Sequence, residues 1–412
     1  MPKLASIKSC TGCLSCADTC NHNAIAIILK NGHPYVTVNK KKCIECGLCE
    51  KSCPIVTPVE TNHIKNMRVY GGWAKNEKMR INAASGGGFS ALASSFIEKH
   101  KDEKVAIYGA TLINNRVKHI SIENEEDIQL LANSKYIQSD TKGIYKDVAK
   151  KLKDGYWIMF SGCPCQISAL YSFLGKKRNN EHLVTVEVVC HGVANNEALD
   201  IHLKYYNSDK IISFRDKKNG SQIGKFSQST TINIKGKETK IPKNDDIFYK
   251  VYTSWLLDRK CCSNCTFARL DRVADITLAD FWGLSNIEYY KKGVSLIISN
   301  NIKGDNLIQD TDTLDIFKES IDKAINGNPH LYIGYKFIQW HPIVLWPNFF
   351  RKILSERVRF NILTNRMPYK LFWALFKIAT IYLTKYRKRL ILKKLYRNKE
   401  TRHLLNIEVK SK

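Results

Sequence analysis

The chain has 412 residues, of which 44% are hydrophobic and 25% are charged, so its composition is that of a globular protein and excludes a disordered or collagen-like chain. This length predicts about three domains. The formal net charge is +27, and the basic excess is concentrated near the C-terminus: residues 340–412 hold 18 Lys and Arg against three Asp and Glu. Such an excess favours an acidic partner surface, with anionic lipid ahead of nucleic acid.

The first ten residues contain no long apolar run, so we expect no signal peptide. Fourteen cysteines in a chain without an export signal are typical of a reducing compartment and of cofactor ligation. We therefore expect a cytoplasmic protein whose cysteines bind cofactors.

Eight of the cysteines form two runs that share one spacing, C-x2-C-x2-C-x3-C. This spacing is typical of [4Fe–4S] sites, and in two-cluster ferredoxins the fourth cysteine of each run ligates the other cluster. We therefore assign a first cluster to Cys10, Cys13, Cys16 and Cys53. The second cluster is assigned to Cys43, Cys46, Cys49 and Cys20. Two such clusters predict a protein that handles electrons one at a time.

Zinc is the alternative ligand of these cysteines, because paired C-x2-C motifs also bind zinc. Two matched runs of four cysteines favour the clusters over zinc and over a disulfide framework. Between the runs, residues 24–29 and 35–38 are apolar or β-branched, and Asn31-Gly32 predicts a hairpin turn. Residues 1–62 are therefore predicted to form a small α+β module of the ferredoxin type, with Pro54 and Pro58 in its exit segment.

A mixed α/β pattern follows this module. Apolar and β-branched runs predict strands at 105–113, 117–122, 156–160, 183–189, 225–234, 275–279 and 294–299. Longer periodic runs predict helices at 89–99, 127–132, 143–152, 166–174, 195–206 and 247–257. Strands that alternate with helices favour a mostly parallel sheet with helices on its faces.

The pattern changes again near residue 340. Residues 371–383 are mostly apolar, but they are too few to cross a bilayer, which needs about 20. Basic residues follow this run directly, so residues 339–412 are predicted to be a basic helical tail. One interpretation is peripheral contact of residues 340–412 with an anionic membrane at its inner face. The alternative is a helix packed on the protein's own core with a solvated basic face.

Six cysteines lie outside the two runs. Cys163 and Cys165 stand where a predicted strand ends and a helix begins, and the carboxyl ends of strands are where open α/β sheets bind ligands. Cys190 also follows a strand, and Cys262 and Cys265 have C-x2-C spacing. One interpretation is that Cys165, Cys190, Cys262 and Cys265 form a third metal centre, a further [4Fe–4S] cluster. The alternatives are zinc at the C-x2-C pair and buried free thiols.

Two further segments are candidates for ligand contact. Ser85-Gly86-Gly87-Gly88 precedes a predicted helix, where backbone N–H groups can cradle a phosphate; the alternative is a plain tight turn. The strand predicted at 275–279 ends in Asp280-Phe281-Trp282-Gly283, which suits either a ligand site or an ion-paired surface strand.

Eight segments of the chain occur in the same order in one protein family. They are Ser85-Gly86-Gly87, Lys135-Tyr136-Ile137-Gln138-Ser139, Gly162-Cys163-Pro164-Cys165-Gln166-Ile167, Cys190-His191-Gly192, Phe214-Arg215-Asp216-Lys217, Cys262-x2-Cys265-x-Phe267-Ala268, Arg272-x2-Asp275-Ile276-Thr277-x2-Asp280-Phe281-Trp282-Gly283 and Gly293-Val294-Ser295-Leu296. In this order they resemble the coenzyme F420 hydrogenase/dehydrogenase beta-subunit family, of which many bacterial members carry a two-cluster ferredoxin segment in front. The basic tail lies outside the resemblance.

The resemblance implies that residues 66–155 are the N-terminal-type domain of this family and residues 156–338 its C-terminal-type domain. It implies bound FAD and electron transfer between the clusters and a substrate or soluble acceptor such as F420; bacterial members are often encoded in surface-polysaccharide loci. It supports a third cluster at the four cysteines assigned above. The flavin contacts that it implies are Ser85, Gly86, Gly87, Gly88, Lys135, Tyr136, Gln138 and Ser139.

Together these features predict an α/β iron–sulfur flavoprotein oxidoreductase of unknown substrate, served by a redox partner protein or a soluble electron carrier. His191 and Asp280 are candidate catalytic side chains by position, the alternatives being a structural histidine and a salt-bridged aspartate. Two other classes stay open. One is a non-catalytic electron-transfer adaptor for a partner enzyme. The other is a peripheral membrane or nucleic-acid-binding protein whose clusters are structural, with nucleic acid the less favoured partner.

Overall fold

The computed structural model describes residues 1–217, 228–243, 245–253, 258–284 and 292–332. Residues 1–334 form one compact unit, and residues 335–412 form a second unit. The predicted basic tail, its helix at 371–383 and its membrane contact therefore lie outside the described residues, as do the ends of the elements predicted at 225–234 and 247–257. In the part of the chain that is described, no helix is both long enough and apolar enough to cross a membrane.

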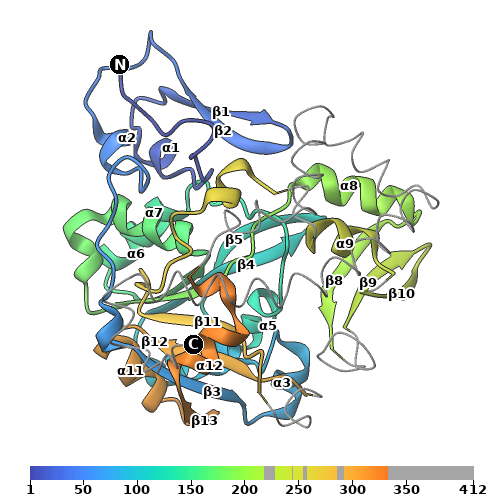
Figure 1. Cartoon of the computed structure of the whole chain (residues 1–412). Helices are drawn as coiled ribbons and strands as arrows, with labels where there is room; N and C mark the ends of the chain where they lie inside the picture. Colours follow the sequence, from blue (N-terminus) through green and yellow to red (C-terminus); the bar gives the residue numbers. More distant parts are fainter. Residues whose placement is uncertain (218–227, 244, 254–257, 285–291, 333–412) are drawn as a thin grey trace, which may run out of the picture. The chain divides into compact units, whose positions relative to one another are not determined.

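The N-terminal module contains a hairpin and two short helices (Figure 1). Strands β1 (Ile25–Lys30) and β2 (His33–Val38) pair antiparallel, and the turn between them is the predicted Asn31-Gly32. Both turn residues have positive φ, 52° and 70°, as a two-residue hairpin of this hand requires. Each helix, α1 (Ser15–Thr19) and α2 (Leu48–Lys51), lies inside one cysteine run. One cysteine run therefore directly precedes the hairpin in the chain, and the other directly follows it.

The body of the unit is built on an eight-stranded sheet with the strand order β13-β3-β12-β11-β7-β6-β4-β5. The strands are β3 (Arg68–Ala74), β4 (Val105–Ile113), β5 (Arg116–Ile122), β6 (Trp157–Gly162), β7 (Leu183–Val188), β11 (Ile276–Asp280), β12 (Ser295–Ser299) and β13 (Leu314–Glu319). Strands β4, β6, β7 and β11 are mutually parallel. Strands from both predicted family domains, 66–155 and 156–338, contribute to this one sheet.

The expectation of a mostly parallel sheet is corrected by four antiparallel pairings, which β3, β5, β12 and β13 make. The turn between β4 and β5 explains one of them. Asn114 and Asn115 both have positive φ, so the chain reverses within two residues and the next strand must run antiparallel.

The body also carries helices and a second, antiparallel sheet of order β10-β9-β8. These strands are β8 (Lys210–Asp216), β9 (Ser229–Ile234) and β10 (Lys237–Pro242). The helices are α3 (Glu77–Asn82), α4 (Gly88–Lys99), α5 (Ile128–Leu131), α6 (Ile144–Lys153), α7 (Pro164–Leu174), α8 (Asn196–Tyr205), α9 (Ile247–Thr253), α11 (Ile302–Gln309) and α12 (Ile321–Gly327). Short 3-10 turns lie at η1 (Ile64–Asn66), η2 (Glu125–Asp127), η3 (Gly175–Asn179), η4 (Lys260–Asn264) and η5 (Pro329–Leu331).

Successive side chains of the central strands pack in two separate hydrophobic layers, one on each face of the sheet. Ile107 of β4 and Met159 of β6 pack in one layer with residues of α4, α5 and α11. Their neighbours Tyr108 and Phe160 pack in the other layer with residues of α6 and α7. Because successive side chains of a strand point to opposite faces, helices cover both faces of the sheet, as the sequence predicts.

The sequence pattern missed β3, although this strand holds β12 and β13 together. Its Gly71-Gly72 pair is typical of a turn. In the structure a Cβ at Gly71 would clash with the ring of Phe317, and a Cβ at Gly72 with the backbone of Asp315. The two glycines thus allow β13 to approach closely instead of ending the strand.

The N-terminal module is hydrogen-bonded to the body at several points. Thr141 donates to the carbonyl oxygen of Cys13 at 2.7 Å, and the Gly143 amide donates to the buried Asp18 carboxylate at 2.8 Å. At the exit segment, the Asn62 amide side chain donates to three successive carbonyls, including that of Ala274 at 2.9 Å. The module is therefore part of the body's packing and not a separate domain on a loose linker.

We expect Gly304→Ala to lower the free energy of unfolding. Gly304 lies in the first turn of α11, and an added Cβ would clash with the carbonyl oxygen of Asp275 beside β11. Alanine usually favours a helix over glycine by about 1 kcal/mol, but overpacking against fixed backbone costs about 1–3 kcal/mol. Urea denaturation measures the difference.

The matched control is Asn306→Ala, which changes an exposed residue of the same helix. Its effect should stay within about 0.5 kcal/mol of the parent. A Gly304→Ala protein as stable as the parent would contradict the close approach of α11 to β11.

Candidate functional site

The cysteines assigned to the first cluster lie close together and are largely buried. Burial raises the pKa of the Cys13 thiol to about 11, and the Cys10 and Cys53 thiolates add to this shift. Burial likewise raises the pKa of Cys16, whose neighbouring thiolates are Cys13, Cys53, Cys10 and Cys49. Cys53 of the second run thus stands among the sulfurs of the first run. Buried thiols that resist ionisation without a cation, as Cys13 and Cys16 do, suit iron ligation, because a coordinating metal deprotonates its thiols.

The cysteines assigned to the second cluster line one cavity of about 160 Å³, which also contains Gly47 and Leu48 at its wall. Cys46 is exposed at this cavity and Cys49 is buried. Burial, with the Glu50 carboxylate and the Cys20 and Cys46 thiolates, raises the pKa of Cys49. The Ala24 amide donates to the Cys20 sulfur at 3.3 Å, a contact that suits a metal-bound thiolate. A cavity walled by four sulfurs fits a cubane cluster.

The structure also brings together the four cysteines proposed for a third centre. The thiolates of Cys190, Cys265 and Cys262 act on Cys165, whose pKa is raised chiefly by burial. Cys13 of the first group acts on Cys165 as well, so the two sulfur groups adjoin.

Cys163 is a fifth sulfur at this place. A hydrogen bond from Cys163 lowers the pKa of Cys190 and raises that of Cys163.

In the described part of the chain, no three His, Cys, Asp or Glu side chains are arranged to hold a single metal ion.

The loop at Ser85–Gly88 leads from α3 into α4 and packs on the ends of β11 and β12. The Ser85 hydroxyl donates to the carbonyl of Val294 at 2.6 Å. The amides of Gly86 and Gly88 donate to the Ser295 hydroxyl at 3.0 and 3.2 Å. The amides expected to face a flavin phosphate are therefore engaged with a serine of the neighbouring strand in this structure.

The predicted contacts at 135–139 have diverse partners. Lys135 donates to three carbonyls at the end of α5, the nearest at 2.5 Å. Gln138 donates to the carbonyls of Thr11 and Gly12 in the N-terminal module, and Ser139 accepts from Gln166 at 2.9 Å. Only Tyr136 among the residues expected to contact flavin in this loop lies in the aromatic and basic group described next.

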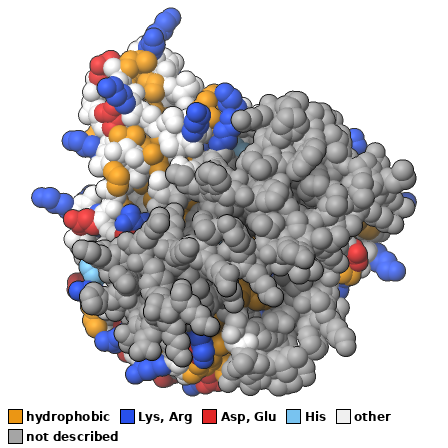
Figure 2. All heavy atoms as spheres, in the orientation of Figure 1, with side chains coloured by type: hydrophobic (Ala, Val, Ile, Leu, Met, Phe, Trp, Pro, Cys, Tyr) orange, Lys and Arg blue, Asp and Glu red, His pale blue; other side chains and the backbone are white. Residues whose placement is uncertain are grey.

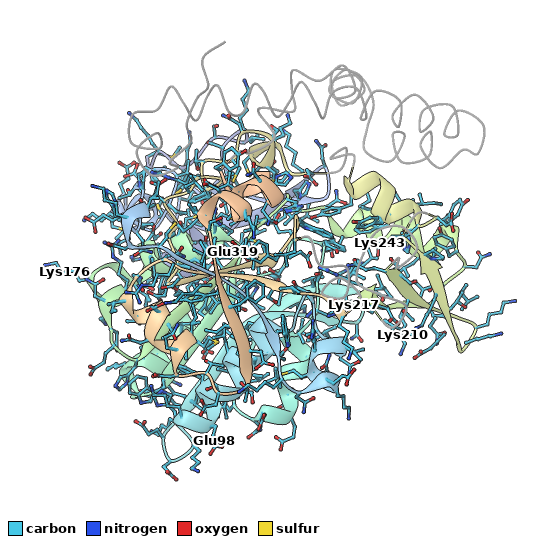
Figure 3. The ribbon with its side chains drawn as sticks, turned by 60° about the horizontal axis from the view of Figure 1, so that its bottom comes forward. Glu98, Lys176, Lys210, Lys217, Lys243 and Glu319 are labelled. Carbon is cyan, nitrogen blue, oxygen red and sulfur yellow. The ribbon has the colours of Figure 1, made fainter. Side chains whose placement is uncertain are left out.

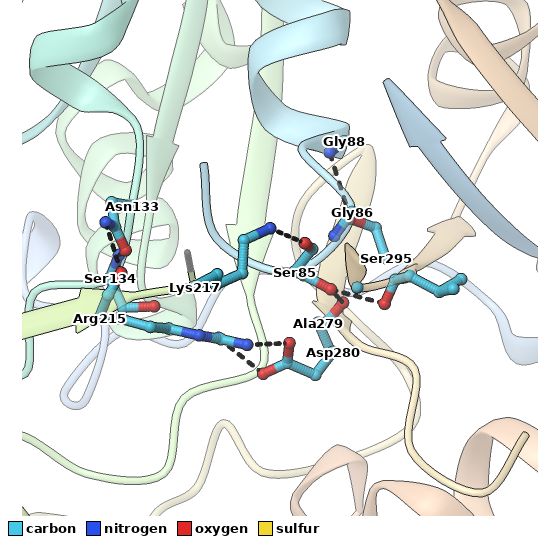
Figure 4. A network of polar contacts seen from close by, with 12 residues as sticks. Ser85, Gly86, Gly88, Asn133, Ser134, Arg215, Lys217, Ala279, Asp280 and Ser295 are labelled. Carbon is cyan, nitrogen blue, oxygen red and sulfur yellow. Dashed lines mark hydrogen bonds and ion pairs between the residues drawn. The ribbon is translucent and has the colours of Figure 1, made fainter. Parts of the chain in front are cut away.

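A buried group of charged side chains surrounds the end of β11 (Figure 4). Arg215 of β8 makes two hydrogen bonds to Asp280, at 2.8 and 2.5 Å. Burial alone would raise the pKa of the Asp280 carboxyl, but the Arg215 guanidinium offsets this and the net pKa is lowered. Lys217 reaches back to the backbone carbonyls of Arg80 and Ser85. The Ser85 loop and Asp280, predicted as separate candidates, thus share one site.

Lys243 is the second buried lysine of this region, and Figure 3 labels it near Lys217. It is 4% exposed, and its ammonium lies 3.9 Å from the ring centroid of Tyr249 and 3.4 Å from the Tyr136 hydroxyl. Burial lowers the pKa of Lys243 well below its ordinary value and that of Lys217 to about 7. The described basic residues here outnumber the acidic ones, so the group favours an anionic ligand.

His191 connects this group to the third sulfur group, because it directly follows Cys190. Its ring stacks on His330 with centroids 4.1 Å apart. Burial lowers its pKa to about 4, and Asp280, Arg215 and Lys243 all act on it. His191 is therefore neutral at pH 7, and the two candidate catalytic residues His191 and Asp280 belong to one electrostatic neighbourhood.

Sequence reasoning assigned no role to Arg215, Lys217 or Lys243. The first two lie in the Phe214-Arg215-Asp216-Lys217 segment that contributed to the resemblance, which was a usable signal. Lys243 follows a strand of the three-stranded sheet and carried no local signal, because only the fold places it beside Tyr136.

Comparisons with known proteins agree with the two parts of this site. Residues 9–56 match the family model of the 4Fe–4S dicluster domain. Residues 156–321 match the family model for the carboxyl-terminal part of the coenzyme F420 hydrogenase/dehydrogenase beta subunit. Among curated proteins, none matches the chain.

One solved structure similar to this chain is the F420-reducing [NiFe] hydrogenase complex from Methanosarcina barkeri, determined with xenon derivatization. The sequence identity is 15%, the match covers 66% of this chain and 87% of that chain, and the TM-score is 0.44.

The fold, the cysteine groups and the family matches define an iron–sulfur protein with a role in electron transfer. More particularly, residues 156–321 match the carboxyl-terminal part of the coenzyme F420 hydrogenase/dehydrogenase beta subunit, and residues 9–56 match a two-cluster [4Fe–4S] domain. The predicted resemblance to this family and the predicted two-cluster domain are confirmed.

We expect Asp280→Asn to destabilise the folded protein by about 3 kcal/mol, because it leaves the buried Arg215 guanidinium without its counter-charge. Equilibrium urea denaturation at pH 7 measures the loss. The folded carboxyl has a lowered pKa, so its stabilising contribution is present at neutral pH and is lost as the pH falls through that pKa. Asp280→Asn should remove this part of the acid dependence.

The control is the double variant Arg215→Met with Asp280→Leu, which removes both charges together. It should lose less stability than Asp280→Asn, because no unpaired charge stays buried. Equal losses in the two proteins would show that the ion pair is not the stabilising feature.

Proposed function

We propose that the chain is an FAD- and [4Fe–4S]-dependent oxidoreductase that passes electrons between its sulfur-ligated clusters and a small-molecule substrate or soluble acceptor. The observation that carries this proposal is the succession of three cysteine groups. They run from the exposed Cys46 through Cys49 and Cys16 to Cys13 and Cys165. A route for single electrons into the body of the protein follows from that order.

The third cysteine group is the inner end of this route. Cys165, Cys190, Cys262 and Cys265 come from strand ends and one loop, and their thiols share one buried region. Four such sulfurs suit a third [4Fe–4S] cluster. The proposed third cluster lies between the first cysteine group and His191, so it would connect the first cluster to the proposed substrate site.

The basic group at Arg215, Lys217 and Lys243 is the proposed flavin and substrate end. Its buried positive charge suits the pyrophosphate of FAD or an acidic substrate. Tyr136 and Tyr249 supply aromatic surface beside Lys243. When bound, FAD supplies the exchange between single-electron and hydride chemistry. The neutral His191 can hold or accept a hydrogen bond there, and Asp280 keeps Arg215 in place.

The source of electrons is proposed to be a redox partner protein or a soluble carrier. The family resemblance extends the proposal to a substrate in surface-polysaccharide biosynthesis, in the cytoplasm. A non-catalytic adaptor is the second candidate function, and one observation favours it. Because Ser295 occupies the amides of Gly86 and Gly88, the loop offers fewer free donors to a flavin phosphate.

Anaerobic purification with iron, sulfide and flavin measured per chain tests this proposal. Three clusters predict about 12 irons and two predict about eight. We expect about 12 irons and one FAD released on denaturation. Cys190→Ser and Cys265→Ser should each lower the iron content toward eight.

The matched control is Cys163→Ser, which changes a neighbouring sulfur outside the proposed ligand set and should keep the full iron content. A preparation with eight irons and no flavin would leave the adaptor as the function. Twelve irons without flavin would keep the third cluster and remove the FAD proposal.

A further inference from the structure

Arg259 occupies an unusual position between the N-terminal module and the inner cysteine loops. It is fully buried, at 0% exposure. Its backbone amide donates to the carbonyl of Val193, three residues after Cys190, and its carbonyl accepts from the Cys262 amide at 3.0 Å. The backbone of Arg259 is thus held by both loops of the third cysteine group.

The side chain of Arg259 extends into the N-terminal module. Nε donates to the Cys10 carbonyl at 2.8 Å, and Nη2 donates to the Pro34 carbonyl at 2.6 Å. Nη2 also lies 3.6 Å from the Cys10 sulfur, within hydrogen-bond distance for sulfur. The guanidinium carbon stands 4.1 Å from the ring centroid of Tyr35, and Nη1 donates to Gln138 at 3.1 Å.

The module's backbone is shaped to admit this guanidinium. A Cβ at Gly12 would come within 2.5 Å of Nη1, and Gly12 has a φ of +66°. Glycine is the residue that meets both demands, the close approach and the left-handed backbone. The loop of the first cluster is therefore built around the arginine.

The charge of Arg259 requires a partner that the described acceptors do not supply. Its acceptors among the described residues are three neutral oxygens and the Cys10 sulfur, and none is a carboxylate. A buried guanidinium is costly unless an opposite charge compensates it. A cluster bound by four thiolates carries net negative charge, so the first cluster at Cys10 fits this demand.

We propose that Arg259 is the positioning residue and counter-charge of the first cluster. Its hydrogen bond to Cys10 and its positive charge stabilise the reduced, more negative state of that cluster and so raise its reduction potential. Through its backbone, the same residue ties that cluster to the loops of Cys190 and Cys262. The inference rests on the two-cluster domain and not on flavin, so it can fail or stand independently of the proposed enzyme activity.

Redox titration followed by EPR spectroscopy on the full chain, purified without oxygen, tests this role. Arg259→Gln should shift the potential of the first cluster downward and leave the second cluster unchanged. Arg259→Lys keeps the charge but loses the forked donor, so its shift should be smaller. Cys46→Ser alters only the second cluster and assigns the signals.

The matched control is Arg178→Gln, because Arg178 pairs with the exposed Glu60 and contacts no cysteine among its described partners. It should leave both potentials unchanged. An unchanged first-cluster potential in Arg259→Gln with full iron content overturns the proposal. If Arg259→Gln loses iron, the Arg259→Lys variant provides the test instead. An unchanged potential of the first cluster in Arg259→Lys would then overturn the proposal.

A different observation concerns the outer face of the module, which we define as the surface of residues 40–48. Ile44 is 62% exposed and Leu48 is 44% exposed, beside the exposed Cys46 of the second cluster. In Figure 2, hydrophobic and basic side chains lie side by side on the N-terminal module, at the upper left of the view. Large apolar side chains around a solvent-facing cofactor are typical of a docking surface.

The charge of this outer face is positive. Lys40, Lys41 and Lys42 are exposed and make no ion pair within the described residues. Of the nearby acids, Glu45 is paired with the N-terminal ammonium at 2.9 Å, and Glu50 accepts from the Lys3 amide. Charge complementarity therefore favours an acidic partner.

We infer that the outer face docks a small acidic protein that carries single electrons, and that the second cluster is its point of electron exchange. The inference rests on the electron-transfer role of the chain. Stopped-flow reduction of the clusters by an acidic flavodoxin hydroquinone tests it and requires no bound flavin in this chain, so the failure of the FAD proposal would not affect the result.

Replacing Lys40, Lys41 and Lys42 by glutamate should slow the second-order rate at least tenfold at low salt, with convergence toward the parent rate at high salt. The matched control places glutamate at Lys146, Lys150 and Lys153, which are exposed on α6 and change the net charge equally. Equal slowing by both triple variants, or no slowing by the first, overturns the docking face.

Discussion

Burial of many thiols close together is the physical constraint on which this protein depends. Buried thiols such as Cys13 and Cys16 resist ionisation, because burial raises their pKa and the neighbouring sulfurs repel the thiolate. Iron supplies the positive charge that reverses this balance. Since the module's loops also hydrogen-bond to the body through Thr141 and Asp18, metal binding and correct packing of the N-terminal half are coupled.

The central sheet gives the redox groups a common frame. The parallel strands β6, β7 and β11 end near Cys163, Cys190 and Asp280, so sulfur chemistry and the buried charges meet at one edge. Arg272 with Glu187, and Asp275 with Thr185, tie β11 to β7. The functional residues are therefore placed by the most buried part of the fold.

Local patterns predicted the parts of the structure that local physics decides. Cysteine spacing predicted the module, Asn31-Gly32 its hairpin, and periodicity most elements between residues 89 and 206. Long-range contacts decided the rest. Gly71-Gly72 lies within a strand because Phe317 requires the space, and Lys135 contacts carbonyls of α5. The partners of Lys243 and Arg259 come from distant segments, so no window of the sequence could reveal them.

The clamp that Asn62 makes at the end of the module has a kinetic consequence. With its side chain held by the carbonyls of Arg272, Val273 and Ala274, the segment leaves no hinge for the module to swing about. Separations between successive sulfur groups are then constant, and tunnelling between them need not wait for a domain rotation. Electron transfer through the module is then paced by encounters with redox partners at its surface, because no part of the path has to move.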